Sequence, residues 1–117
     1  MKTILIVEDI DLNIDLLTQL LEDDFSLLVA KNGIEGVEAA EGQNPDLILM
    51  DISLPVMDGY EAVSLIRKSN QEIPIIGLSA HAMQGDIQKA LEAGFSDYLT
   101  KPINEDLLFQ KIRLFLG

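Results

Sequence analysis

Five short apolar runs, spread along the whole chain, constrain its fold more than any other feature. They are ILIV at 4–7, LLVA at 27–30, LILM at 47–50, IIGL at 75–78 and YL at 98–99. Polar or turn residues bound each run, and none is long enough for a buried helix. Short apolar runs of this kind are typical of strands that are covered on both faces. We therefore predict a strand at each of them.

The segments between these runs have the periodicity of helices. Leucine occupies positions 12, 16, 17, 20 and 21, a stripe about half a helix circumference wide at ~100° per residue. Asn32 and Asp58 each precede a helical segment and have a glutamate three residues later, which resembles a capping box. Gly94 is placed to end a helix, and Asn104 to begin the last one. The inward face of that last helix is predicted to carry Leu107, Leu108, Ile112 and Phe115.

Strand and helix alternate five times, which predicts an α/β fold. The expected architecture is a doubly wound five-stranded parallel sheet with helices on both faces, joined by right-handed crossovers. No linker, low-complexity tract or repeat interrupts the pattern, so residues 1–117 are expected to form a single domain. Apolar residues make up 48% of the chain and charged residues 24%, which is ordinary for a globular domain of this kind.

Charge and composition argue against several classes of function. The formal net charge of −12 would repel phosphate backbones and anionic lipid, so we expect no nucleic-acid or membrane partner. The chain has no cysteine, which excludes disulfides, thiolate catalysis and zinc–sulfur sites. The first apolar run is too short for a signal peptide or a membrane span, and a cytoplasmic location is predicted.

Polar residues follow four of the five predicted strands. Glu8 and Asp9 follow the first, Asp51 the third, Ser79 the fourth and Lys101 the fifth. The carboxyl ends of parallel strands share one edge of the sheet, and ligands bind there at the point where the strand order reverses. The order 2-1-3-4-5 of flavodoxin-like sheets, taken from known folds of this type, puts that point between the first and third strands. Asp9 and Asp51 would then lie together.

Three carboxylates at one edge need an opposing charge. Two unit charges 4 Å apart repel by about 4 kcal/mol at an effective dielectric constant of 20. Mg²⁺ prefers carboxylates, water and a phosphate as ligands, while Lys101 adds a fixed positive charge and Ser79 a hydroxyl. Together these groups are the ones that phosphoryl transfer needs for positioning and for charge stabilisation. Each has an ordinary interpretation by itself, such as a turn residue for Asp51 or a helix cap for Ser79, but their convergence favours a functional site.

Four segments in this order and spacing resemble the receiver domain of response regulators, the CheY-like superfamily of two-component and phosphorelay signalling. They are ILIVEDIDLN, PDLILMDISLPVMDGYE, PIIGLSAHAM and EAGFSDYLTKPI, and the resemblance covers the whole chain. Receivers of hybrid kinases are the most similar. The resemblance implies a (βα)5 flavodoxin-like three-layer sandwich with strand order 2-1-3-4-5.

The resemblance also implies a role for each residue at the predicted site. Asp51 matches the phospho-accepting aspartate, Asp9 a direct Mg²⁺ ligand, and Glu8 an acidic neighbour that acts mainly through water. Ser53 matches the residue that gives a backbone carbonyl to the metal. Ser79 matches the hydroxyl that holds the phosphoryl group, and Lys101 the lysine that pairs with it. The bond from Lys101 to Pro102 is usually cis in the family.

The implied function is that of a signalling switch. A histidine kinase or histidine phosphotransfer protein would donate a phosphoryl group to Asp51 with the help of Mg²⁺. The domain would then control a downstream protein partner or pass the phosphate on, as a phospho-accepting regulator and not as a conventional enzyme. Ser79 and Tyr98 match the switch pair, with Tyr98 turning inward beside the fourth and fifth helices. Ile14, predicted to be half-exposed at the rim of the leucine stripe, is a second candidate for partner contact.

Two other functions remain open from the residues alone. An aspartyl-phosphate phosphatase of haloacid-dehalogenase type would use Asp9 in the motif DID at 9–11, but Leu12 and Asn13 stand where its threonine belongs. A flavodoxin-like cofactor binder needs a phosphate-cradling loop after the first strand, and EDIDLN would repel a phosphate. The lone His81 is expected to have no metal or relay role.

Overall fold

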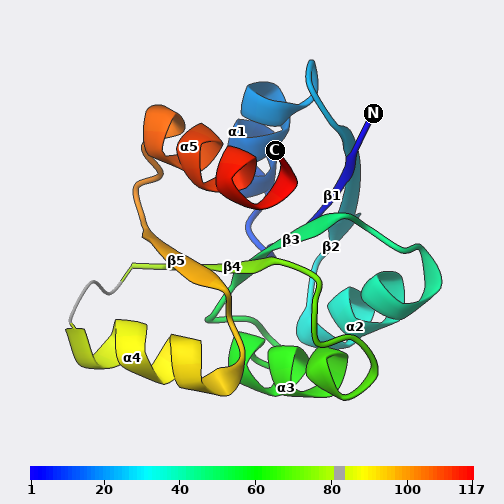
Figure 1. Cartoon of the computed structure of the whole chain (residues 1–117), viewed down its shortest axis with the longest axis vertical. Helices are drawn as coiled ribbons and strands as arrows, with labels where there is room; N and C mark the ends of the chain where they lie inside the picture. The colour runs from blue at the N-terminus through cyan, green and yellow to red at the C-terminus, as the bar shows by residue number, and fades with distance from the viewer. Residues whose placement is uncertain (81–83) are drawn as a thin grey trace.

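The five apolar runs form one parallel sheet in the order β2-β1-β3-β4-β5, as predicted (Figure 1). The computed structural model describes residues 1–80 and 84–117, so His81 lies outside the described residues. Strand and helix alternate through the whole chain. The elements are β1 (Thr3–Val7), α1 (Asp11–Leu21), β2 (Ser26–Ala30), α2 (Gly33–Gly42), β3 (Leu47–Asp51), α3 (Gly59–Ser69), β4 (Ile75–Ser79), α4 (Gln84–Ala93), β5 (Asp97–Thr100) and α5 (Glu105–Leu116).

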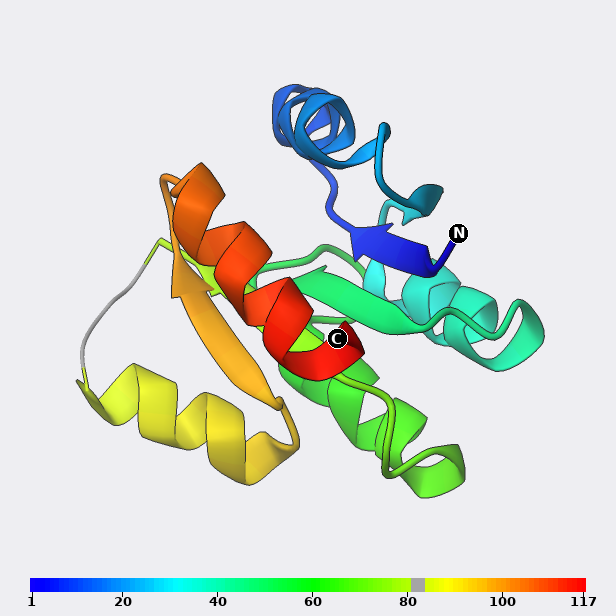
Figure 2. The same cartoon turned by 45° about the horizontal axis from the view of Figure 1, so that its top comes forward.

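Helices cover both faces of the sheet and divide the core into two layers. Figures 1 and 2 show α1 and α5 on one face and α2, α3 and α4 on the other. The side chains of each strand alternate between the layers, because successive residues of a strand point to opposite faces. Ile4 and Ile6 of β1 pack with the α1 and α5 layer, while Leu5 and Val7 pack with the other. The three inner strands are therefore buried almost throughout.

The edge strand β2 departs from the prediction. The run at 27–30 was expected to be covered on both faces, but its burial is partial and Val29 is exposed. The prediction was wrong here because the helices do not fully cover this edge of the sheet, whereas the strand at the other edge, β5, has its two central residues buried. Apolar composition alone does not distinguish an edge strand from an inner one.

Helix α1 buries only part of the predicted leucine stripe, together with Ile14. Ile14, Leu17 and Leu21 face the sheet, whereas Leu12 is 76% exposed and Leu16 is 46% exposed. The prediction that Ile14 is half-exposed was therefore wrong, since only 8% of it is accessible. The leucine stripe is wider than the strip of helix surface that the sheet can cover, and the covered strip lies toward Ile14.

The last helix shows the same effect. Leu108 and Ile112 are buried as predicted and Phe115 is partly buried, but Leu107 is exposed. Leu107 lies one position away from the buried stripe, so the helix turns it out of the core. Its predicted inward position was wrong.

The helix caps agree with the sequence signals. The side-chain oxygens of Asn32, Asp58 and Asn104 accept hydrogen bonds from the backbone N–H three residues later, each at 2.9 Å. Gly94 follows α4 with φ of 121°, a conformation that favours glycine. Asn32 and Asp58 begin the helices that follow β2 and β3, so they anchor loops at the carboxyl edge of the sheet.

Candidate functional site

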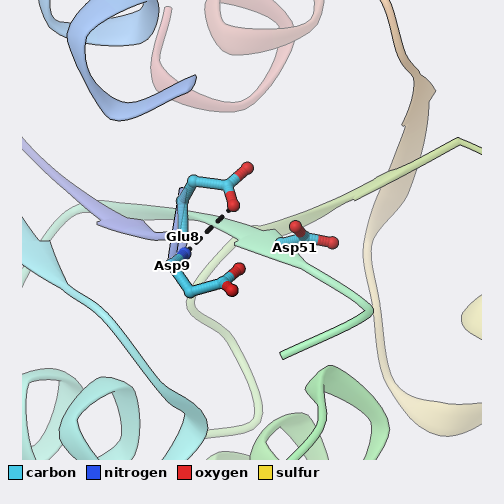
Figure 3. A group of neighbouring side chains, drawn as sticks. All are labelled: Glu8, Asp9 and Asp51. Atoms are coloured by element: carbon cyan, nitrogen blue, oxygen red, sulfur yellow. Dashed lines mark hydrogen bonds between the residues drawn. The ribbon is translucent and has the colours of Figure 1, made fainter. Parts of the chain in front are cut away.

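Three carboxyl groups meet where β1 and β3 end. Glu8 and Asp9 directly follow β1, and Asp51 is the last residue of β3. The two strands are neighbours with Val7 opposite Met50, which carries the next residues of both strands to the same point of the edge. One carboxylate oxygen from each of the three residues lies within 4.8 Å of the others (Figure 3). The predicted convergence of Asp9 and Asp51 is therefore confirmed, with Glu8 beside them.

Two of these carboxyl groups are withdrawn from solvent. Glu8 is 0% exposed and Asp51 is 4% exposed, while Asp9 is the most open of the three. A buried carboxylate needs hydrogen-bond donors to replace lost water. Glu8 Oε2 accepts from the backbone N–H of Asp9 at 3.0 Å and of Ile10 at 3.3 Å. Asp51 Oδ1 accepts from the N–H of Ser53 at 2.9 Å.

Lys101 supplies the positive charge of the site. Its Nζ lies 2.9 Å from Glu8 Oε1 and 2.9 Å from Asp51 Oδ2. Burial lowers the pKa of Lys101, but the hydrogen bonds to Glu8 and then Asp51 outweigh that effect and raise the pKa overall, so the ammonium is charged at neutral pH. One ammonium group faces three carboxyl groups, and the site is left with an excess of acidic oxygen.

The backbone around Lys101 places its side chain. The Lys101 N–H donates to the Ser79 carbonyl oxygen at 2.7 Å, which continues the ladder between β4 and β5 past the last strand residue. The Lys101–Pro102 peptide bond is cis. Ser79, the last residue of β4, is buried, and its carbonyl is thus tied to the lysine that contacts Asp51.

Tyr98 lies three residues before Lys101 on the same chain segment. Its side chain is 6% exposed and packs in the core layer that includes Ala90 of α4 and Phe95. The resemblance implied that this ring turns inward as part of the switch. In this structure the Tyr98 side chain is already buried.

A small cavity beside the site has no counterpart in the sequence analysis. Its volume is about 120 Å³, and it opens between α1 and the segment after β5. The lining residues are Glu8, Asn13, Leu16, Leu17, Leu78, Lys101, Pro102 and Ile103. The polar Asn13 within an otherwise apolar helix face was the sequence signal that could have marked this cavity.

The chemistry of the site follows from its oxygen atoms and its lysine. Carboxylate oxygens are the ligands that hard divalent cations prefer, and the excess of acidic groups favours such a cation. Lys101 is placed to hold an anionic group against Asp51. None of the helices within residues 1–80 and 84–117 has the length and apolar character needed to cross a bilayer.

Comparison with known proteins agrees with this geometry. Residues 4–113 match the family described as the response regulator receiver domain. The polar-differentiation response regulator DivK of Brucella anthropi is 35% identical over 119 residues, which cover 99% of this chain and 97% of that protein. Hybrid signal transduction histidine kinase G of Dictyostelium discoideum is 44% identical over 106 residues, which cover 86% of this chain but only 3% of the kinase.

Solved structures with the same fold include two with informative contents. The receiver domain of sensor histidine kinase PA1611 from Pseudomonas aeruginosa, with a magnesium ion coordinated in its active-site cleft, has a TM-score of 0.92 and 39% identity, and the match covers 99% of this chain and 98% of that one. The second is a co-crystal structure from Saccharomyces cerevisiae, which contains the histidine phosphotransfer signaling protein Ypd1 and the receiver domain of its downstream response regulator Ssk1. The matching chain has a TM-score of 0.91 and 37% identity, and the match covers 97% of this chain and 88% of that one. The sheet order, the acidic edge and these matches agree, and the chain belongs to the response regulator receiver domain family.

Proposed function

We propose that Asp51 accepts a phosphoryl group from the phosphohistidine of a histidine kinase or a histidine phosphotransfer protein. The observation that carries the proposal is the pair of contacts at Asp51. Ser53 N–H holds one carboxylate oxygen and Lys101 Nζ holds the other, each at 2.9 Å. A nucleophile needs this kind of fixed orientation, and the lysine is placed to stabilise charge on an incoming phosphoryl group.

The residues of the site fit Mg²⁺. The carboxylates of Asp9 and Asp51 and the carbonyl of Ser53 are the proposed direct ligands. Glu8 is proposed to act on the ion through water, as the resemblance implies, while two backbone amides and Lys101 hold its carboxylate in place. When bound, Mg²⁺ would offset the repulsion between an anionic phosphoryl group and the acidic edge.

The transfer itself is a single displacement at phosphorus. A carboxylate oxygen of Asp51 forms a bond to phosphorus, and the bond from phosphorus to the donor's imidazole nitrogen breaks. The imidazole carries a proton on its other ring nitrogen, so it leaves as the neutral ring. Lys101 and the Ser79 hydroxyl donate to the phosphoryl oxygens in this proposal. Attack by water later returns the Asp51 carboxylate and inorganic phosphate, so the domain is a self-resetting regulator and not an enzyme with a separate substrate.

Apolar side chains around the acidic edge support a protein phosphodonor. Ile10, Leu12 and Leu16 are exposed next to Glu8 and Asp9, and Val56 is exposed in the loop after Asp51. A small phosphodonor would have no use for such a surface, whereas a protein partner could cover it. The complex of Ypd1 with a receiver domain shows that a structure similar to this one has a partner of that class.

A second surface is proposed for the downstream partner. Leu91 on α4 and Leu107 and Leu114 on α5 are exposed large apolar residues on helices that flank β5 and Tyr98. A change at Ser79 or Tyr98 would reach this surface first. We further propose that residues 1–117 work as one domain and that it acts in the cytoplasm.

Mass spectrometry tests the proposed acceptor. The protein is incubated with acetyl phosphate and Mg²⁺, and the modified peptide is mapped. Addition of one phosphoryl group at Asp51 is expected. Modification at Asp9 would instead support the phosphatase of haloacid-dehalogenase type. That alternative has less support, because Lys101 contacts Asp51 and Glu8.

A further inference from the structure

We infer that Gly33, the first residue of α2, is a positioning residue for the acidic site. It acts by holding the loop at 52–58, which joins β3 to α3, in a strained conformation that orients Asp51 and Ser53. The inference rests on the proposed function, since it concerns the metal and phosphoryl site at Asp51. Gly33 lies on α2, an element that contributes no side chain to this site, and the inference gives it a part in positioning the site.

The loop contains a tight turn with an unusual central residue. Met57 N–H donates to the Pro55 carbonyl oxygen at 2.7 Å, which closes a three-residue γ-turn around Val56. Val56 has a φ of 67°, a conformation that a β-branched side chain rarely adopts. Strained backbone of this kind persists only where the surrounding structure holds it in place.

Gly33 is the neighbour that holds the turn. A Cβ atom built on Gly33 would lie 2.0 Å from the Met57 carbonyl oxygen and 2.8 Å from its carbonyl carbon. The start of α2 is thus in direct contact with the backbone of the turn. Gly33 itself is not in the left-handed region of φ, so its backbone conformation does not require glycine. The need for glycine at this position is purely steric.

The opposite end of the loop is equally close to the site. A Cβ atom on Gly59 would lie 2.7 Å from the Asp51 carbonyl oxygen, and Gly59 N–H donates to the Ile52 carbonyl at 2.8 Å. The loop is therefore fixed between the first residue of α2 and the end of β3. Ser53 lies within it and donates its N–H to Asp51 Oδ1.

A side chain at position 33 would displace the loop and not the helix. Helix α2 is anchored by its Asn32 cap and by close packing of Gly36 against Val7, where a Cβ would lie 2.9 Å from Cγ1. Ser53, Pro55 and Val56 of the loop are exposed, so the loop has room on its solvent side to accommodate the shift. Met57 must shift by about 1 Å to bring a new Cβ contact from 2.0 to 3.0 Å. Because the loop is short and stiffened by Pro55, the displacement of Met57 should extend to Ser53. A misplacement of about 1 Å is enough to impair a catalytic site.

The test compares Gly33→Ala with Gly42→Ala, a control in the same helix whose new Cβ would meet nothing within 4 Å. Mg²⁺ affinity is measured by titration, and the Ser53 amide shift is measured by NMR in metal-free protein. Gly33→Ala should weaken Mg²⁺ binding by about tenfold, as is usual when a residue that orients metal ligands is changed. It should also move the Ser53 resonance and slow phosphorylation by acetyl phosphate. Gly42→Ala should change none of these quantities.

A double variant separates positioning from general destabilisation. Val56→Gly relieves the strain at the turn, so Gly33→Ala/Val56→Gly should recover thermal stability, while its Mg²⁺ affinity stays below that of Val56→Gly alone. The same variant carries the test if Gly33→Ala alone does not fold. Recovery of affinity together with stability would overturn the inference, as would wild-type affinity in Gly33→Ala. Failure of the wild-type protein to bind Mg²⁺ or accept a phosphoryl group would instead count against the proposed function.

Discussion

Lys101 Nζ lies 2.9 Å from Asp51 Oδ2, and the same amine lies 2.9 Å from Glu8 Oε1. The lysine thus joins the ends of β1 and β3 through its side chain, although it follows the edge strand β5. Both carboxyl groups are nearly inaccessible, so loss of Lys101 would leave them buried without their counter-charge. A substitution of Lys101 should therefore change the free energy of unfolding, even without metal or phosphodonor.

Lys101→Ala should destabilise the metal-free protein by about 3 kcal/mol, because it leaves buried carboxyl groups without their counter-charge. Mg²⁺ should reduce this loss, since the ion would supply positive charge at the same place. Urea denaturation with EDTA and with Mg²⁺ measures both effects. Lys111→Ala is the matched control, because its pair with Asp97 is more exposed and should contribute less than about 1 kcal/mol. An equal loss with and without Mg²⁺ would contradict the prediction.

Asp51→Asn should abolish phosphorylation and leave the fold intact. The substitution removes one of three crowded carboxyl groups, while Lys101 keeps its contact with Glu8. The melting temperature should stay the same or rise. Peptide mapping after treatment with acetyl phosphate and a thermal melt provide the two measurements, with Asp23→Asn, an exposed aspartate after α1, as control. Continued phosphorylation at Asp9 would contradict this assignment.

Asp9→Asn should weaken Mg²⁺ binding at least tenfold, which corresponds to ~1.4 kcal/mol. Asp9 is the most open carboxyl group of the three, and is thus the one best placed to hold an ion without disturbing Lys101. Isothermal calorimetry measures the affinity. Asp15→Asn on the exposed side of α1 should leave it unchanged. An unaltered titration of Asp9→Asn would remove Asp9 from the ligand set.

The features that the sequence predicted correctly depend on local pattern. Strands at short apolar runs, caps at Asn32 and Asp58, and acidic residues at strand ends follow from spacing within a few residues. The errors concern tertiary context. Periodicity in α1 allowed either Leu12 or Ile14 to face the sheet, and only the position of the helix against its neighbours decides between them. The contact of Gly33 with the Met57 backbone has no local signature at all.

The buried position of Tyr98 refines the predicted switch. Tyr98 belongs to the same core cluster as Ala90 of α4, and its backbone N–H donates to Asp97 Oδ1 at 2.8 Å. Asp97 in turn pairs with Lys111 of α5 at 2.9 Å. Tyr98 and its neighbour Asp97 thus lie between α4 and α5, and we predict that a displacement of Ser79 on the neighbouring strand shifts α4 through Tyr98.

Beryllofluoride with Mg²⁺ is expected to mimic the phosphoryl group on Asp51 and to shift NMR resonances from Asp51 through Ser79 and Tyr98 to α4 near Ile87. Such coupling requires two conformations of the domain whose populations the ligand changes. The chemical shifts should therefore report a change in these populations and not a continuous distortion of one conformation. Lys101→Ala should preserve most of the metal binding but shorten the spread, because Lys101 is the donor that meets the new charge. Shifts confined to the loops around Asp9 and Asp51 would show that α4, β5 and α5 do not form the output surface. The exposed Leu12 and Leu16 of α1 would then be the better candidates, since Ile14 is buried and unavailable to a partner.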